Sequence, residues 1–227
     1  MIEHTQKIKE LYEDIQRKLF YMIPEKWDKL YLYASVMERL GNVETGELYF
    51  YYIPKGILKK NPINVYEVPA KFNLDEKEYI KLVEKLYNTI KELRMEFKKV
   101  EPLKDVWSNV TISIQNNKFK VEYVYEDLLK SKFSSYERHI IWRSKYLNIG
   151  VDRCNKQEKE VLKQFIESPE VWARKEKYET GIYIQDIQNI VDFDTQEYKK
   201  VENIENFSQE EECATTNQIL MYNKEKN

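Results

Sequence analysis

Alternating hydrophobic positions predict an aromatic β-hairpin in the N-terminal third of the chain. Its two strands span Leu30–Val36 and Leu48–Ile53, with a glycine-containing loop between them. Strand side chains alternate between the two faces of a sheet. One face is therefore mainly aliphatic and carries Leu30, Leu32, Ala34, Val36, Leu48, Phe50 and Tyr52. The other, which we call the tyrosine face, carries Tyr31, Tyr33, Tyr49 and Tyr51.

The tyrosine face is too large to be left in water. Each aromatic side chain buries about 150–250 Å². Four of them together reach or exceed the roughly 300–600 Å² of the largest apolar patch on an ordinary monomer. We therefore expect this face to be covered, either by a helix of the same chain or by another protein.

Hydrophobic residues spaced three and four positions apart predict several amphipathic helices. They span residues 8–19, 79–97, 134–146 and 155–166, and a shorter helix is predicted from Ser168-Pro169 around Trp172. Asn73 and Glu76 are predicted to cap the second helix, and Ser134 with Glu137 is predicted to form a capping box for the third. The first helix ends before Pro24, because proline disfavours a helical residue in front of it.

Three further strands are predicted from residue type and alternation. Ile63–Val68 lies between Pro62 and Pro69, which is typical of an edge strand because proline cannot donate a ladder hydrogen bond. Val110–Gln115 and Phe119–Tyr125 flank Asn116-Asn117. Asparagine tolerates the positive φ of a two-residue hairpin turn, so these two strands are predicted to be antiparallel.

The helix that begins after Ser134 has more than one apolar side. Consecutive Ile140, Ile141 and Trp142 spread apolar groups over roughly 200° of its circumference. We therefore expect it to lie between two surfaces, one of them the tyrosine face. The chain is predicted to be an α+β protein with a five-stranded antiparallel sheet, whose aliphatic face is covered by the helices at 8–19 and 79–97.

The pattern changes after residue 149, so we predict a domain over 1–149 and an α/β C-terminal extension over 150–227. Short strands are predicted at Gly181–Gln185 and Gln218–Tyr222. Between them, residues 192–212 contain eight acidic side chains and two lysines, a local net charge of −6. This acidic segment lacks hydrophobic periodicity, and we expect part of it to be mobile.

Composition indicates a globular chain without a basic excess. Hydrophobic residues make up 42% of the 227 positions and aromatic residues 14%, which is incompatible with disorder throughout. A formal net charge of −2 argues against a dedicated nucleic-acid-binding protein. The two cysteines lack disulfide or zinc spacing. The N-terminus has no signal-peptide core, and no stretch is apolar enough to span a membrane, so a cytoplasmic location is expected.

No catalytic motif is present, and no cofactor is predicted. The two histidines have no partner at metal-binding spacing, and no nucleophile elbow or phosphate loop occurs. Two alternatives remain open. A metal-dependent hydrolase would use Glu47, Glu122 and Asp127. A weak nucleic-acid-binding protein would use the lysines at positions 55, 59, 60, 98 and 99, with nearby tyrosines stacking on bases.

Seven short blocks, taken in order, resemble the YezG-type immunity proteins, the group that includes the EsaG-like antitoxins of Gram-positive bacteria. The blocks are Trp27, Leu30–Ala34, Gly46–Pro54, Trp107–Thr111, Lys118–Leu128, Tyr136–Trp142 and Lys145–Leu147. The resemblance implies a small cytoplasmic protein that neutralises the nuclease domain of a secreted polymorphic toxin, often one with an LXG-type export region. It implies no enzymatic activity and makes no prediction of oligomeric state.

For such an inhibitor, the sequence suggests a toxin-binding surface at the end of the last predicted strand. Glu122, Glu126 and Asp127 are expected to face a basic nuclease cleft. Tyr49, Tyr51 and Tyr125 are the expected aromatic anchors, because interfaces depend on a few large buried side chains. Direct contact with nucleic acid or a membrane is not expected.

Overall fold

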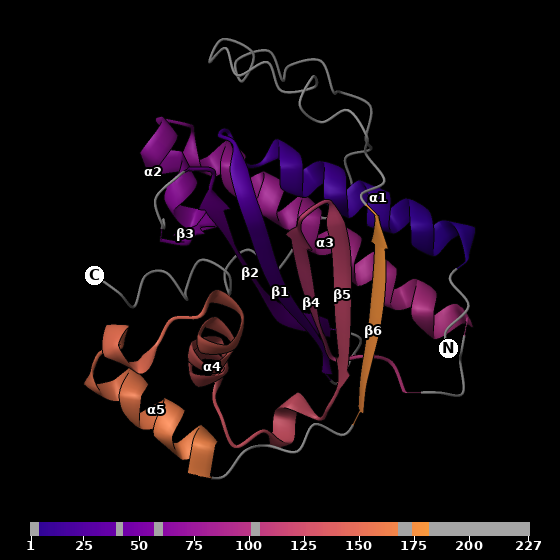
Figure 1. Cartoon of the computed structure of the whole chain (residues 1–227). Helices are drawn as coiled ribbons and strands as arrows, with labels where there is room; N and C mark the ends of the chain where they lie inside the picture. Colours follow the sequence, from indigo (N-terminus) through magenta and orange to yellow (C-terminus); the bar gives the residue numbers. More distant parts are fainter. Residues whose placement is uncertain (1–4, 40–42, 57–60, 101–104, 168–173, 182–227) are drawn as a thin grey trace.

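The computed structural model describes residues 5–39, 43–56, 61–100, 105–167 and 174–181, which form an α+β structure as predicted (Figure 1). The helices in these residues are α1 (Gln6–Tyr21), α2 (Val68–Phe72), α3 (Glu76–Val100), α4 (Ser135–Leu147) and α5 (Lys156–Glu167), with 3₁₀ turns η1 (Val65–Glu67), η2 (Leu128–Lys130) and η3 (Val151–Arg153). The strands are β1 (Trp27–Arg39), β2 (Val43–Pro54), β3 (Ile63–Asn64), β4 (Asn109–Gln115), β5 (Lys118–Tyr125) and β6 (Arg174–Gly181).

The described strands form one antiparallel sheet in the order β3-β2-β1-β4-β5-β6. The aromatic hairpin is confirmed: β1 pairs with β2 along its length, with Tyr33 opposite Tyr49 and Tyr31 opposite Tyr51. The second predicted hairpin is also confirmed. Asn116 and Asn117 have φ values of 51° and 57°, the left-handed conformations that a tight two-residue turn requires.

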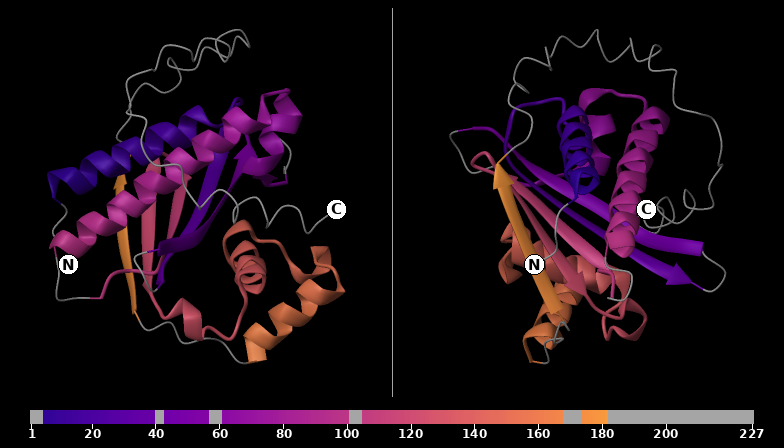
Figure 2. Two further views of the ribbon diagram at one scale, coloured as in Figure 1. Left: turned by 180° about the vertical axis from the view of Figure 1, so that it is seen from behind. Right: turned by 90° about the vertical axis from the view of Figure 1, so that its right-hand side faces the viewer.

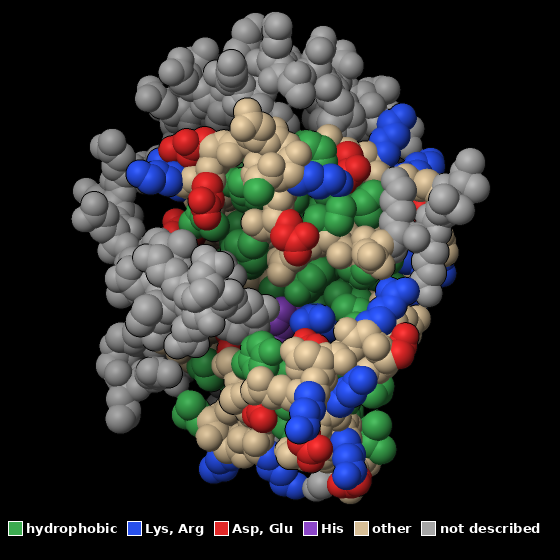
Figure 3. Space-filling view, turned by 90° about the vertical axis from the view of Figure 1, so that its left-hand side faces the viewer, with side chains coloured by type: hydrophobic (Ala, Val, Ile, Leu, Met, Phe, Trp, Pro, Cys, Tyr) green, Lys and Arg blue, Asp and Glu red, His purple; other side chains and the backbone are tan. Residues whose placement is uncertain are grey.

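Helices lie on both sides of this sheet. Figure 2 shows α1 and α3 on one side and α4 with α5 on the other. Figure 3 shows the molecule from the left-hand side of Figure 1. On this face, hydrophobic side chains gather between charged ones. Exposed apolar residues in the described chain include Leu129 in η2 and Val151 in η3.

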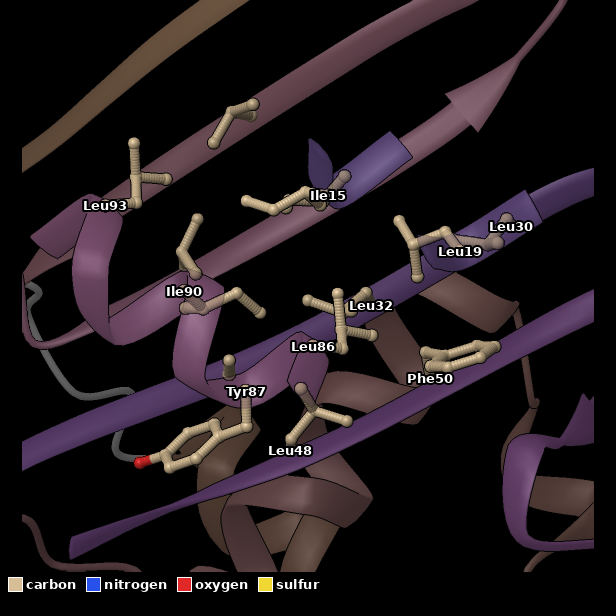
Figure 4. Close-up of a cluster of buried hydrophobic side chains, with 14 of the residues drawn as sticks. Ile15, Leu19, Leu30, Leu32, Leu48, Phe50, Leu86, Tyr87, Ile90 and Leu93 are labelled. Atoms are coloured by element: carbon tan, nitrogen blue, oxygen red, sulfur yellow. The ribbon is translucent and has the colours of Figure 1, made fainter. Parts of the chain in front are cut away.

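The main core lies between the sheet and the helices α1 and α3 (Figure 4). Ile15 and Leu19 of α1 and Leu86 and Ile90 of α3 point toward the aliphatic face of the hairpin, and all are fully buried. The predicted positions of these two helices are therefore confirmed. The core also contains a hydroxyl pair: the Tyr12 and Tyr123 oxygens are 2.5 Å apart and join α1 to β5.

The sheet has one strand more than the five predicted, because Arg174–Gly181 forms β6 along the edge of β5. This strand alternates lysine and glutamate and has no hydrophobic alternation, so the sequence pattern did not indicate it. Tyr178 holds β6 to the body, since its ring stacks on Tyr12 at 5.2 Å. Gly181 was predicted to begin a strand but is the last residue of β6. The predicted elements at 168–172 and 218–222 lie outside the described residues.

The predicted strand Ile63–Val68 is shorter than expected. Only Ile63 and Asn64 pair with β2. The Asn64 side chain then accepts a hydrogen bond from the Tyr66 backbone N–H at 3.2 Å and caps η1. Pro69 lies in the first turn of α2, a position where its missing N–H costs nothing. Residues 65–68 therefore form η1 and the start of α2, in place of the strand that their hydrophobic residues suggested.

Gly46 provides a test of how closely β2 approaches α3. A Cβ atom at this position would lie 1.9 Å from the Ser35 backbone oxygen and 2.2 Å from the Tyr87 hydroxyl oxygen. Gly46→Ala is expected to lower the free energy of unfolding by about 2–3 kcal/mol, measured by urea denaturation. Gly181→Ala is the control, because nothing lies within 4 Å of its added Cβ. Equal stability of the two variants would contradict this packing.

Candidate partner-binding surface

Helix α4 covers the tyrosine face of the hairpin. The Tyr33 and Tyr49 rings stack at 4.8 Å, and the Trp142 ring meets Tyr49 edge-on at 5.3 Å. Trp142 Nε1 also donates a hydrogen bond to Thr111 Oγ1 of β4 at 3.1 Å. The tyrosine face is therefore covered by a helix of the same chain and not by another protein.

His139 extends this cluster along α4. Its Nε2 atom lies 2.9 Å from the Tyr51 hydroxyl oxygen, and its ring centroid lies 3.9 Å from that of Tyr49. Tyr49 and Tyr51 are only 4% and 8% exposed. Burial raises the pKa of Tyr51 to about 12, even though the charge of Arg143 acts in the opposite direction. Both predicted anchors thus lie in the interior, and direct contact with a partner would require α4 to move.

Two ion pairs from α4 fix its position. Arg138 is buried and lies 3.8 Å from a Glu47 carboxylate oxygen on β2. Its Nη1 atom also donates to the Phe133 carbonyl oxygen at 2.8 Å. On the opposite side, Arg143 lies 3.3 Å from a Glu158 carboxylate oxygen of α5. Because an arginine buried without a partner is costly, these pairs hold α4 between the sheet and α5.

Glu122 lies on the α4 side of the sheet and is surrounded by positive charge. Its carboxylate accepts a hydrogen bond from the Tyr146 hydroxyl at 2.9 Å, and the amines of Lys145, Lys175 and Lys177 lie 3.5–3.6 Å away. Partial burial acts to raise the pKa of this carboxyl, but the three lysines and the Tyr146 hydroxyl outweigh it and lower the pKa below its ordinary value. Glu122 therefore neutralises lysines of its own chain.

Glu126 and Asp127 lie where β5 ends and η2 begins. Asn109 Nδ2 donates a hydrogen bond to the Glu126 carboxylate. The Asp127 carboxylate accepts from the Leu129 backbone N–H at 3.1 Å and lies 3.0 Å from the Lys130 amine. Asp127 nevertheless keeps 49% of its side-chain surface exposed. It is thus the most exposed of the three predicted acidic residues.

Tyr125 belongs to the opposite face of the sheet. It is buried in the main core, and its hydroxyl donates to Glu176 Oε2 of β6 at 3.2 Å. The structure consequently does not bring the six predicted site residues together. Glu126 and Asp127 are neighbours, whereas Tyr49 and Tyr51 lie under α4 and Glu122 lies within a lysine cluster. This cluster was missed because recognising it requires knowing that β6 pairs with β5.

The carboxylates named for a metal-dependent hydrolase do not form a cluster. Among the described residues, no group of three or more histidine, cysteine, aspartate or glutamate side chains is arranged to hold a metal ion. Glu47 pairs with Arg138, Glu122 with lysines and Asp127 with Lys130. The hydrolase alternative therefore has no support in the described part of the chain.

The lysines named for nucleic-acid binding come from separate elements. Lys55 directly follows β2, and Lys98 and Lys99 lie in the last turn of α3. Lys59 and Lys60 lie outside the described residues. In the same described ranges, no helix combines the length and apolar character needed to cross a membrane.

The contribution of the Trp142 hydrogen bond can be measured by a double-mutant cycle. Trp142→Phe keeps a ring on the tyrosine face but removes the donor to Thr111, and Thr111→Val removes the acceptor. We expect the two changes to show a coupling free energy of about 0.5–1.5 kcal/mol in urea denaturation. Additive effects would mean that this bond does not hold α4 on the sheet.

Glu122→Gln tests the charge of the lysine cluster. The folded pKa of Glu122 lies below its unfolded value of about 4.5. The unfolded chain therefore binds the proton first as the pH falls. The stabilisation is complete at neutral pH and is lost as the pH falls below about 4.5. Because the carboxyl is partly exposed, we expect the substitution to cost only about 1 kcal/mol at pH 7.

The same substitution should weaken the acid dependence of stability, followed by thermal unfolding between pH 7 and pH 3. Glu160→Gln on the exposed surface of α5 is the control. It should retain the profile of the unchanged protein. A profile for Glu122→Gln that matches this control would refute the role of the carboxylate.

Comparison with known proteins places this chain in a family. Residues 8–163 match the family model described as immunity protein YezG-like. The chain is 30% identical to immunity protein YezG of Bacillus spizizenii over 167 residues, 73% of this chain and 97% of that protein. It is 29% identical to immunity protein YezG of Bacillus subtilis, over 70% of this chain and 99% of that protein.

A third relative is the type VII secretion system protein EsaG of Staphylococcus aureus. The identity is 27% over 150 residues, which cover 64% of this chain and 83% of that protein. The matched residues contain the aromatic hairpin, both covering helices and α4. The chain therefore belongs to the YezG-like immunity protein family.

Proposed function

We propose that this chain is a cytoplasmic immunity protein that binds and neutralises the nuclease domain of a cognate secreted bacterial toxin. The observation that carries the proposal is the family match, which extends over the elements from α1 to α4. The names of the YezG relatives support an immunity role, and that of EsaG refers to type VII secretion. Inhibition is by binding, and the protein itself acts without catalysis.

The proposed contact surface is the turn after β5. It presents the Glu126 and Asp127 carboxylates together with Leu129, which is 70% exposed. An exposed leucine beside carboxylates combines an apolar contact with negative charge, which suits the basic cleft of an enzyme that binds nucleic acid. Asp127 caps η2, so the backbone of this turn is already ordered before a partner binds.

The other predicted site residues have a supporting role in this proposal. Tyr125 immediately precedes the turn and fixes the end of β5 in the core. Tyr49 and Tyr51 hold α4 through His139 and Trp142. Glu122 orders the lysines beside α4. These residues position the surface, whereas Glu126, Asp127 and Leu129 touch the toxin.

The proposal is tested by co-expressing the chain with the candidate toxin encoded next to it. We expect survival of the host and co-purification of the two proteins. In vitro, nuclease activity should fall in proportion to added chain and reach its minimum at a fixed molar ratio. Complete inactivation at a small fraction of that ratio would indicate an enzyme. Binding to the toxin's export region alone would contradict the choice of the nuclease domain.

The contact surface is tested by the double reversal Glu126→Lys and Asp127→Lys. We expect the dissociation constant for the nuclease domain to rise at least about tenfold, equivalent to about 1.4 kcal/mol. Calorimetry measures the affinity, and host survival should fall in parallel. The control reverses two exposed carboxylates of other elements, Glu76 and Glu160, for the same change in net charge. If both double variants bind alike, the toxin docks elsewhere on the chain.

A further inference from the structure

Five lysines gather on the α4 side of the sheet at the β5–β6 edge. We call them the lysine face: Lys118, Lys120, Lys145, Lys175 and Lys177. The strand register explains the grouping, because Lys120 lies opposite Glu179 and Glu122 lies opposite Lys177. Alternation puts the intervening residues, among them Tyr123, into the core on the other side. Lys145 joins from α4 through Glu122.

The lysine face carries more positive charge than its own carboxylates neutralise. Lys118 and Lys120 both pair with Glu179, at 2.7 Å and 2.8 Å. The other three lysines share Glu122 at 3.5–3.6 Å. Within the described part of the chain, these ion pairs set five lysines against two carboxylates, Glu122 and Glu179. This crowding is reflected in Lys175, whose pKa is lowered first by burial and then by the charge of Lys145.

The excess charge is matched by a segment of the same chain. Residues 192–212 contain eight acidic side chains and two lysines, a net charge of −6. Gly181, the last residue of β6, lies opposite Lys118 in the sheet register. Asp192 lies eleven positions after Gly181, a stretch of chain that spans at most about 36–40 Å. The chain thus leaves the sheet beside Lys118, and the first residue of the acidic segment, Asp192, is close enough along the chain to reach the lysine face.

We propose that the acidic segment 192–212 docks on the lysine face of its own chain. Charge complementarity favours the contact, and the covalent link makes it unimolecular, so the segment has an advantage over a separate anionic molecule. Opposite charges at partly exposed positions are screened by salt, so the contact should weaken as ionic strength rises. The docked segment contacts neither the toxin nor the turn after β5.

Zero-length crosslinking of the full chain tests the proposal directly. A carbodiimide joins a lysine amine to a carboxylate only when the two are in contact, and mass spectrometry identifies the linked residues. We expect links from the acidic segment to Lys118, Lys120 or Lys177, lost in high salt. Lys77 and Lys85, exposed on α3 across the sheet, are the internal controls. Links to α3 as frequent as those to the lysine face would overturn the proposal.

A variant whose eight segment carboxylates are changed to amides provides an independent measurement. Acetic anhydride should then modify the lysine face several-fold faster than in the unchanged chain, with Lys77 and Lys85 unaffected. Unchanged rates would overturn the proposal. Crosslinking a mixture of isotopically heavy and light chains distinguishes links within one chain from links between two. If heavy-to-light crosslinks dominate, a second copy occupies the lysine face and the proposal is overturned. Equal binding of a single-stranded oligonucleotide by both variants would likewise show that the segment does not occupy the face.

Discussion

The contact between α4 and the tyrosine face is the interaction on which the rest of this structure depends. One side of the β1–β2 hairpin packs on α1 and α3, as in many α+β proteins. The other side would expose stacked tyrosines if Trp142 and His139 did not cover them. Because α4 must pack on the sheet and also on α5, its ion pairs with Glu47 and Glu158 face opposite directions. The helix thus joins the sheet to the extension.

Much of the fold could be predicted from the sequence because its elements have strong hydrophobic periods. The aromatic hairpin, α3 and the capping box at Ser134 follow from local patterns. Strand β6 could not be found in this way, because it is stabilised by pairing with β5 and by one stacked tyrosine. A strand with charges on both faces has no hydrophobic alternation to detect.

The candidate site was harder to predict than the fold. Whether a charged side chain is available to a partner depends on which residues lie beside it in the folded chain. Glu122 looks like a free acidic residue in the sequence, yet Lys145 approaches it from a position 23 residues away. Tyr49 and Tyr51 look like available anchors until α4 is placed over them. Asp127 is different, since its cap and its ion pair are formed with residues that follow within three positions. Interactions between residues close in sequence could therefore be predicted, whereas those between residues far apart in sequence could not.

The separation between the hairpin and its cover has a consequence for synthesis of the protein. His139 follows its partner Tyr51 by 88 residues. At about 5–20 residues per second, the ribosome needs roughly 4–18 seconds to add them. During this interval the nascent hairpin has no α4, and its tyrosines are open to water and to other chains. The aromatic surface that is buried in the folded protein is therefore exposed and prone to aggregation during synthesis. Early protection by chaperones would be advantageous.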